Sequence, residues 1–285
     1  MKPAPFTLHR PSDVAEAAQL LTRFADDEVR ILAGGQSLVP MMAFRLARPG
    51  HLIDINGLGE LAQITQSDGA IEIGALVRHN DIASAEIEGA TGALLKKVMP
   101  NIAHHPIRAR GTICGSLAHA DPSSEWCLSA ATLDAVLLAR SATGKREIAA
   151  RDWFTGAMST SLQADELLTG VRLPVLPEGT RFGFQEFSRR KGDFAICAAL
   201  VVFEIHYGVI EEARIGIGGA EDHPRRIAEG EAVLKGQRPS AELFARAGAA
   251  VAAALDPMED HSTKAAYRRD LACDLVEGAL QEAAR

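Results

Sequence analysis

A proline-rich break near residue 175 limits how this chain can fold. The segment PVLPEG at residues 174–179 cannot continue a strand or a helix, because proline lacks a backbone N–H and glycine favours turns. A chain of 285 residues is long enough to form two compact units. We therefore expect a first unit over residues 1–175 and a second over residues 178–285.

The composition is that of a globular protein with a substantial core. Hydrophobic residues make up 47% of the chain and charged residues 24%, and the formal net charge is -7. A negatively charged protein has no general attraction to nucleic acid or to an anionic membrane, so neither is an expected partner. No apolar stretch is long enough for a signal peptide or a membrane span, and we expect a cytoplasmic location.

In the first unit, hydrophobic spacing predicts helices and strands. Ser12 is the expected N-cap of a helix whose apolar residues recur with helical spacing, namely Val14, Ala17, Ala18 and Leu21. The sequence ITQSDGAIEI at 64–73 predicts a tight hairpin, because Asp68 and Gly69 both tolerate positive φ. Further strands are expected at residues 28–33, 51–55, 135–139 and 167–173, and a further helix at 38–46.

In the second unit, strands and helices are segregated along the sequence. Strands are expected at 182–187, 195–205 and 209–217, and the short Tyr207-Gly208 connection favours an antiparallel meander. Helices are expected at 241–255 and around a final apolar stripe made by Ala272, Leu275, Val276 and Ala279. This segregation favours an α+β fold over a doubly wound one.

The first of two glycine-containing loops covers residues 33–38. It consists of Ala33, Gly34, Gly35, Gln36, Ser37 and Leu38, between an expected strand and an expected helix. Because the glycines carry no side chains, the backbone N–H groups of such a loop can converge on a phosphate. An ordinary turn from strand to helix is the alternative interpretation.

The second loop, GTICGS at residues 111–116, places the hydroxyls of Thr112 and Ser116 around the open Gly115. We expect a helix to begin near Asp121, with Pro122 at its first position. Glu125 would then lie in the first turn. It can accept a hydrogen bond from a sugar or ribityl hydroxyl, or it can be a solvated carboxylate favoured by the helix dipole.

Other motifs do not indicate catalysis or metal binding. The four dispersed cysteines, Cys114, Cys127, Cys197 and Cys273, lack the spacing of an iron–sulfur, zinc or disulfide framework. The last three are expected to be reduced, packed thiols. His104 and His105 have no further ligand at metal spacing, so no metal site is predicted. The GIGG sequence at 216–219 is interpreted as a turn at the end of a strand. We assign no catalytic residue.

Three segments resemble signature sequences of one family. They are AGGQSLVP at 33–40, RGTICGSLAHADPSSE at 110–125 and RRKGDFAI at 189–196. They resemble the FAD-binding medium subunit of the carbon monoxide dehydrogenase and xanthine dehydrogenase family of molybdenum hydroxylases. The resemblance implies an FAD-binding domain with subdomains of about 1–56 and 57–175. It also implies a C-terminal flavoprotein domain, 178–285, with a three-stranded antiparallel sheet and helices.

The resemblance implies a set of FAD-binding residues. Both glycine loops would hold the diphosphate and neighbouring atoms, through Ala33, Gly34, Gly35, Gln36, Ser37, Leu38, Thr112, Cys114, Gly115 and Ser116. Glu125 would hold a flavin-chain hydroxyl, Ile102 and Leu168 would line the cofactor, and Lys191 and Phe194 would approach the isoalloxazine. For Phe194, core packing is an equal alternative. Cys114 departs from the family's paired glycines, so either its φ is negative or its sulfur points away from FAD.

The implied function is electron relay. Electrons from a molybdenum centre would pass through 2Fe-2S clusters to FAD and then to an external acceptor. The implied partners are a small iron–sulfur subunit and a large molybdopterin subunit, in a dimer of heterotrimers. A self-contained FAD-dependent reductase with a related fold is the leading alternative. A scaffold subunit that has lost flavin is another.

Overall fold

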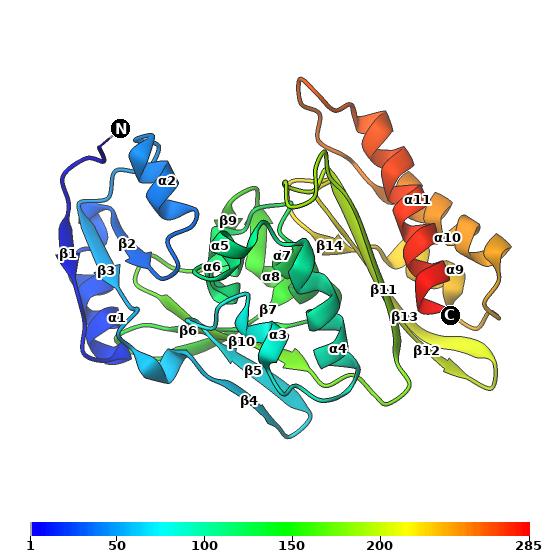
Figure 1. Ribbon diagram of the computed structural model, residues 1–285, viewed down its shortest axis with the longest axis horizontal. Coiled ribbons are helices and arrows are strands. Elements are labelled where there is room, and N and C mark those ends of the chain that lie inside the picture. Colours follow the sequence, from blue (N-terminus) through cyan, green and yellow to red (C-terminus); the bar gives the residue numbers. More distant parts are fainter. Residues whose placement is uncertain (1) are drawn as a thin grey trace.

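Three bodies of sheet and helix lie in a row in the computed structural model, which describes residues 2–285 (Figure 1). The N-terminal body is the smallest and is coloured blue. A central body of antiparallel sheet and short helices follows, and the C-terminal body combines a long sheet with three helices. The mixture of helix and sheet confirms the α+β prediction.

The N-terminal body is built on a parallel sheet with the order β1-β3-β2. Parallel neighbours need crossover connections, and helices provide them here. The helix α1 buries the four residues of the predicted apolar stripe, so that prediction is confirmed. The elements are β1 (Thr7–His9), α1 (Val14–Arg23), η1 (Ala25–Asp27), β2 (Val29–Leu32), α2 (Leu38–Ala43) and β3 (His51–Asp54).

The N-cap of α1 is Asp13, so the prediction of Ser12 was wrong. The Asp13 carboxylate accepts a hydrogen bond from the backbone N–H of Glu16 at 2.8 Å. Ser12 instead donates its N–H and its hydroxyl to the Glu16 carboxylate. Two adjacent residues compete for one capping position, and the residue whose side chain reaches the third N–H of the helix takes it.

The central body holds an antiparallel sheet with the order β4-β5-β10-β6-β7. The predicted hairpin is confirmed, since Asp68 and Gly69 have φ of 50° and 75° between β4 and β5. The strands are β4 (Ile64–Ser67), β5 (Ala70–Gly74), β6 (Val136–Arg140), β7 (Lys145–Ala149) and β10 (Leu167–Pro174). The longer helices are α4 (Gly89–Val98), α6 (Ile113–His119) and α7 (Glu125–Thr132).

Short elements complete the central body. They are η2 (Gly59–Leu61), α3 (Asp81–Ser84), η3 (Met99–Asn101), α5 (His105–Arg108), α8 (Ala150–Trp153), β8 (Phe154–Gly156) and β9 (Ser159–Thr160). Most of these carry no strong hydrophobic period, and the sequence did not predict them.

The C-terminal sheet confirms the predicted meander of three strands and adds a fourth, two-residue strand at its edge. Tyr207 and Gly208 form the tight turn, with φ of 51° and 80°. The strands are β11 (Arg181–Phe187), β12 (Cys197–His206), β13 (Val209–Gly218) and β14 (Arg225–Arg226), and the helices are α9 (Ala228–Leu234), α10 (Ala241–Ala254) and α11 (Ala265–Ala283).

The C-terminal sheet is buried on both faces. Along β12, Cys197, Ala199 and Val201 pack with α9, α10 and α11, whereas Ala198 and Leu200 join the core of the central body. This alternation follows from the two-residue period of a strand. Gly216 lies against Thr132 of α7, where a side chain would collide, so the GIGG sequence serves close packing at a strand end.

Candidate functional site

The two predicted glycine loops lie against each other. Gly34 rests on the carbonyl oxygen of Arg110, and a Cβ added to Gly34 would lie 2.7 Å from the Cα of Gly111. No side chain fits between them. The contact joins the N-terminal body to the central body, so one ligand can touch both loops.

Arg78 and Asn56 bridge these loops, and the sequence analysis found neither. The Arg78 guanidinium donates to the Arg110 carbonyl at 2.5 Å and to Asn56 Oδ1 at 2.6 Å. Asn56 Nδ2 in turn donates to the carbonyl of Ala33 at 2.8 Å. The hydrogen bonds form a continuous path from one loop to the other. Neither residue lies in a recognisable motif, because each acts through distant backbone carbonyls.

The first loop presents a run of unpaired backbone N–H groups. No residue among 2–285 accepts a hydrogen bond from the N–H of Gly34, Gly35, Gln36, Ser37 or Leu38. Gly35 has φ +70°, which turns the backbone into a conformation that favours glycine. Successive N–H groups around such a turn form a concave site for an anionic oxygen, which is what a diphosphate supplies.

The second loop is held by side-chain hydrogen bonds. Thr112 caps α6, and its hydroxyl accepts from the N–H of Gly115 at 3.0 Å. The Ser116 and Ser124 hydroxyls are 2.7 Å apart and hydrogen bonded. Gly115 itself is exposed. Its missing side chain therefore leaves the surface of this loop open to a ligand.

The Cys114 side chain points away from the loop surface. Only 2% of the residue is exposed, and its Sγ lies 3.7 Å from the carbonyl oxygen of Ile73 in the central sheet. Burial raises the pKa of the thiol well above its ordinary value. Its φ is not positive. Cysteine is therefore compatible with this position, because only its backbone faces the loop.

The second loop leads directly into α6, and the next helix, α7, begins at Glu125, so the prediction of a start near Asp121 with Pro122 first was wrong. The Asp121 carboxylate accepts from the N–H of Ser123 at 2.9 Å and closes a turn of its own. Ser124 is the N-cap, and its hydroxyl accepts from the N–H of Cys127. The competing turn at Asp121 delays the helix by three residues, from Pro122 to Glu125.

The segment from 189 to 196 meets this turn from the C-terminal body. Ser123 donates its hydroxyl to the carbonyl of Ala195 at 2.8 Å. Gly192, with φ +88°, lies on His104, whose Cε1 would be 2.6 Å from an added Cβ. The segment that carries Lys191 and Phe194 therefore lies beside both the turn at Asp121 and the turn that follows Ile102.

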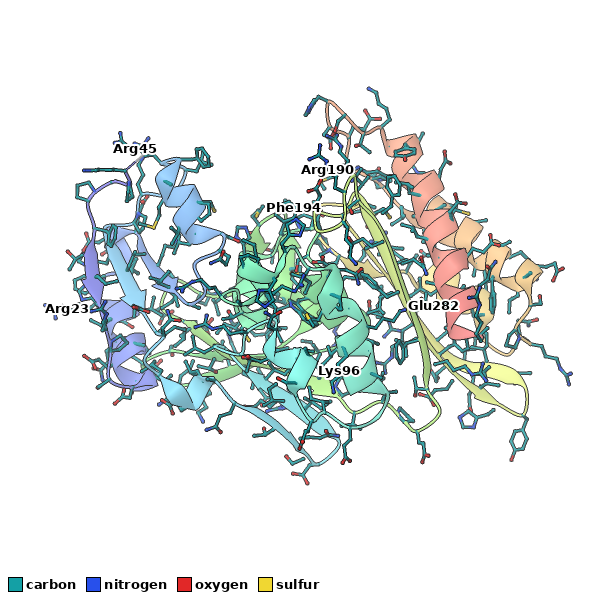
Figure 2. All side chains as sticks on the ribbon, viewed as in Figure 1. Arg23, Arg45, Lys96, Arg190, Phe194 and Glu282 are labelled. Atoms are coloured by element: carbon teal, nitrogen blue, oxygen red, sulfur yellow. The ribbon has the colours of Figure 1, made fainter. Side chains whose placement is uncertain are left out.

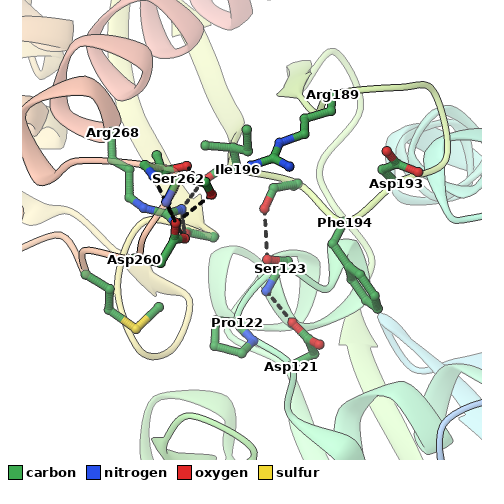
Figure 3. A pocket seen from close by; sticks show the side chains of 14 residues that line it. Asp121, Pro122, Ser123, Arg189, Asp193, Phe194, Ile196, Asp260, Ser262 and Arg268 are labelled. Carbon is green, nitrogen blue, oxygen red and sulfur yellow. Dashed lines mark hydrogen bonds and ion pairs between the residues drawn. The ribbon is translucent and has the colours of Figure 1, made fainter. Parts of the chain in front are cut away.

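Phe194 projects from the protein. Phe194 is 76% exposed, so the alternative of core packing is excluded. Figure 2 shows the residue above the short helices of the central body. It lines a cavity of about 450 Å³, together with Ser123 and Arg189 (Figure 3). Lys191 is also exposed. An exposed aromatic ring beside a cavity is available for stacking on a planar ligand.

Arg268 of α11 fixes the far wall of this cavity. Its guanidinium donates to the carbonyl oxygens of Ile196 and Gly219 at 2.6 and 2.7 Å and to the Asp260 carboxylate at 2.8 Å. The side chain is only 8% exposed. These bonds anchor the strand end next to Phe194. The sequence analysis did not single out Arg268.

The two apolar site residues are both largely buried. Ile102 is 7% exposed and Leu168, on β10, is 4% exposed. Arg108 donates to the carbonyl of Ile102 at 2.8 Å and thereby fixes the turn around it. Each residue therefore exposes only a small apolar surface to a ligand.

Glu125 is buried, so the alternative of a solvated carboxylate was wrong. The residue is 9% exposed. Burial, and then the nearby Glu186 carboxyl, raise the pKa of Glu125 to about 8. Burial also raises the pKa of Glu186 to about 7. The sequence could not reveal this environment, because Glu186 approaches from the C-terminal sheet.

Comparison with known proteins defines the family. The model for the FAD binding domain in molybdopterin dehydrogenase matches residues 4–176, more than half of the chain. The chain belongs to this family. The model for the CO dehydrogenase flavoprotein C-terminal domain matches residues 182–283 of this chain.

Relatives of similar length align with nearly the whole subunit. The caffeine dehydrogenase subunit beta of Pseudomonas sp. (strain CBB1) is 36% identical over 285 residues, covering 100% of this chain and 96% of the relative. The carbon monoxide dehydrogenase medium chain of Afipia carboxidovorans is 33% identical, covering 99% and 98%. The solved carbon monoxide dehydrogenase from Hydrogenophaga pseudoflava has a TM-score of 0.95 at 34% identity, covering 99% and 98%.

These matches establish an FAD-binding oxidoreductase subunit of the molybdenum hydroxylases. Within residues 2–285, no helix is long and apolar enough to cross a membrane. The family and structure matches confirm the family that the three short segments indicated. The individual cofactor contacts remain predictions.

Proposed function

We propose that this subunit holds one noncovalent FAD across its two glycine loops and relays electrons from a 2Fe-2S subunit to an external acceptor. The run of unpaired N–H groups in residues 34–38, packed against the second loop, is the observation that carries this proposal. FAD supplies one-electron and two-electron chemistry when bound. The protein binds the cofactor, orients it and shields it from water.

The cofactor-binding residues form three groups. The diphosphate group comprises Ala33, Gly34, Gly35, Gln36, Ser37, Leu38, Thr112, Cys114, Gly115 and Ser116. Its open N–H groups and missing side chains support this role, and Cys114 contributes only its backbone. Glu125 binds a hydroxyl of the flavin chain, which would satisfy its buried carboxyl.

The third group lies at the ring. Phe194 stacks on the isoalloxazine, supported by its exposure beside the cavity, while Ile102 and Leu168 supply apolar edges. Lys191 places a positive charge near the ring, where a cation favours the anionic reduced flavin.

The partners complete the electron path. We propose a small iron–sulfur subunit, a large molybdopterin subunit and a dimer of heterotrimers in the cytoplasm. The names of the relatives, medium chain and subunit beta, describe parts of larger enzymes. The cysteines of this chain are dispersed and largely buried, which supports cluster binding by a partner. We also propose two domains, 1–175 and 178–285, supported by the separate matched ranges 4–176 and 182–283.

Reconstitution tests the proposal. The purified chain should bind FAD in a 1:1 ratio, measured by flavin absorbance, and should not oxidise the organic substrate of the complete enzyme. Coexpressed small and large subunits should copurify with it and restore turnover with an added electron acceptor. Substrate turnover by the single chain would instead support the self-contained reductase. A flavin-free chain that still assembles would support the scaffold alternative.

A further inference from the structure

A buried carboxyl group and a half-buried one lie where the central body meets the C-terminal sheet. Glu125 is the first residue of α7, and Glu186 lies near the end of β11. Glu186 pairs across the sheet with Ala198, and the next strand brings Gly218 against Leu128 of α7. The Glu186 carboxyl also raises the pKa of Glu125. Neither the sequence motifs nor the family comparison assigned a role to Glu186.

Strand alternation explains why Glu186 faces the central body. On β11, Phe184 packs in the core of the central body, and Glu186 is two residues further on the same face. Its cross-strand neighbour Ala198 belongs to the same core. Gln185 lies on the opposite face, where its side chain contacts Gly278 of α11.

One carboxyl of the pair, that of Glu186, lacks a hydrogen-bond donor at one oxygen. Glu186 Oε2 is buried and has no partner among residues 2–285. Glu125 is 9% exposed, and its carboxyl accepts a hydrogen bond from its own backbone N–H. A buried oxygen without a donor is costly, and folded proteins rarely leave one unsatisfied. The unpartnered Glu186 oxygen therefore points to a ligand that supplies a hydrogen-bond donor.

Neighbouring contacts place this pair at the centre of the cofactor site. Ser124, next to Glu125, bonds to Ser116 of the second loop. Ser123 bonds to Ala195, next to Phe194. The carboxyl pair thus lies between the proposed diphosphate site and the proposed ring site. In FAD, the ribityl chain with its several hydroxyl groups joins those two parts.

We propose that Glu125 and Glu186 together bind the hydroxyl groups of the ribityl chain, with Glu186 as a cofactor contact from the C-terminal domain. This inference rests on the proposed FAD-relay function. A carboxylate accepts hydrogen bonds and a protonated carboxyl also donates one, and the hydroxyl groups of a polyol can pair with either form. A cation site fits less well, because no third His, Cys, Asp or Glu joins the pair within the described chain.

The test compares FAD with ADP, which lacks both the ribityl chain and the ring. Affinities of the apoprotein are measured by quenching of flavin fluorescence and by calorimetry, for Glu186→Leu, Glu186→Gln and the control Gln185→Leu. We expect Glu186→Leu to weaken FAD binding about tenfold or more. ADP affinity should stay within about twofold, and Glu186→Gln and the control should retain FAD affinity within about threefold.

Unchanged FAD affinity in Glu186→Leu, or an equal loss for FAD and ADP, would overturn the inference. If Glu186→Leu does not fold, Glu186→Thr replaces it, since the shorter polar side chain cannot reach the hydroxyls and predicts the same FAD-selective loss. A wild-type chain that binds no FAD would contradict the proposed function itself. A wild-type chain that binds FAD beside an unaffected variant would contradict only the role of Glu186.

Discussion

Gly34 and Arg110 are in direct contact, with the glycine Cα facing the arginine carbonyl oxygen. This contact brings together loops from two bodies of the protein that lie far apart in the sequence. The absence of a side chain at Gly34 is a requirement of the site geometry rather than of a turn, because its φ is not positive.

Substitution of Gly34 tests this contact. Gly34→Ala should separate the loops and weaken FAD binding about tenfold or more, because the Cβ would collide with rigid backbone. Gly57→Ala is the matched control, since nothing lies within 4 Å of its Cβ position. Fluorescence titration of the apoproteins measures the effect. Equal FAD affinities of the two variants would contradict a shared site across the loops.

Arg78 should act as a positioning residue. Arg78→Met removes both hydrogen bonds that connect Arg110 with Asn56, and the charge-assisted bonds are each worth about 1–3 kcal/mol. We expect a lower midpoint of thermal unfolding and at least a fivefold loss of FAD affinity. Arg151→Met, at a largely exposed side chain, is the control. An Arg78 variant with wild-type FAD affinity would show that the loops hold their positions without this bridge.

Phe194 should affect the flavin more than the fold. Because the residue is 76% exposed, Phe194→Ala should change the free energy of unfolding of the apoprotein by about 0.5 kcal/mol or less. It should, however, shift the visible flavin spectrum or the reduction potential. Tyr207→Ala, at a fully exposed hairpin turn, should shift neither. Identical spectra for wild type and Phe194→Ala would refute ring stacking.

The buried Glu125 should make the apoprotein less stable as pH rises. Its pKa is raised from 4.5 to about 8, so between these values the folded protein retains a proton that the unfolded chain has released. The free energy of unfolding therefore falls as the pH rises through this window. Above pH 8, the stability that the retained proton provides is lost. Asp121 and Glu186 face the same carboxyl and reinforce the trend.

Glu125→Gln removes this titration. At pH 7 the variant should be more stable than wild type by on the order of 1–3 kcal/mol, and the difference should shrink near pH 4.5. Thermal unfolding of both apoproteins at several pH values measures it. Parallel stability curves would mean that Glu125 is not protonated in the folded state. Bound FAD should reduce the difference if its hydroxyl groups bond to the carboxylate.

Local sequence determined the parts of the fold that depend on neighbouring residues. The hairpin at Asp68-Gly69 and the turn at Tyr207-Gly208 follow from residues that tolerate positive φ, and α1 follows from its apolar period. The small elements of the central body escaped prediction, because segments of three or four residues are defined by what they pack against. The starts of α1 and α7 were misplaced where two polar residues competed for one cap.

The candidate site shows the same division. Sequence motifs were sufficient to predict the two loops, the segment around Phe194 and the family, because the chemistry of glycine and hydroxyl residues is readable from their order. Only tertiary structure decided that the Cys114 sulfur enters the core, that Arg78 links the loops, and that Glu186 meets Glu125 across a domain boundary. The physical reason is that burial and charge interactions depend on distances through space, which the packing of separate sheets and helices sets.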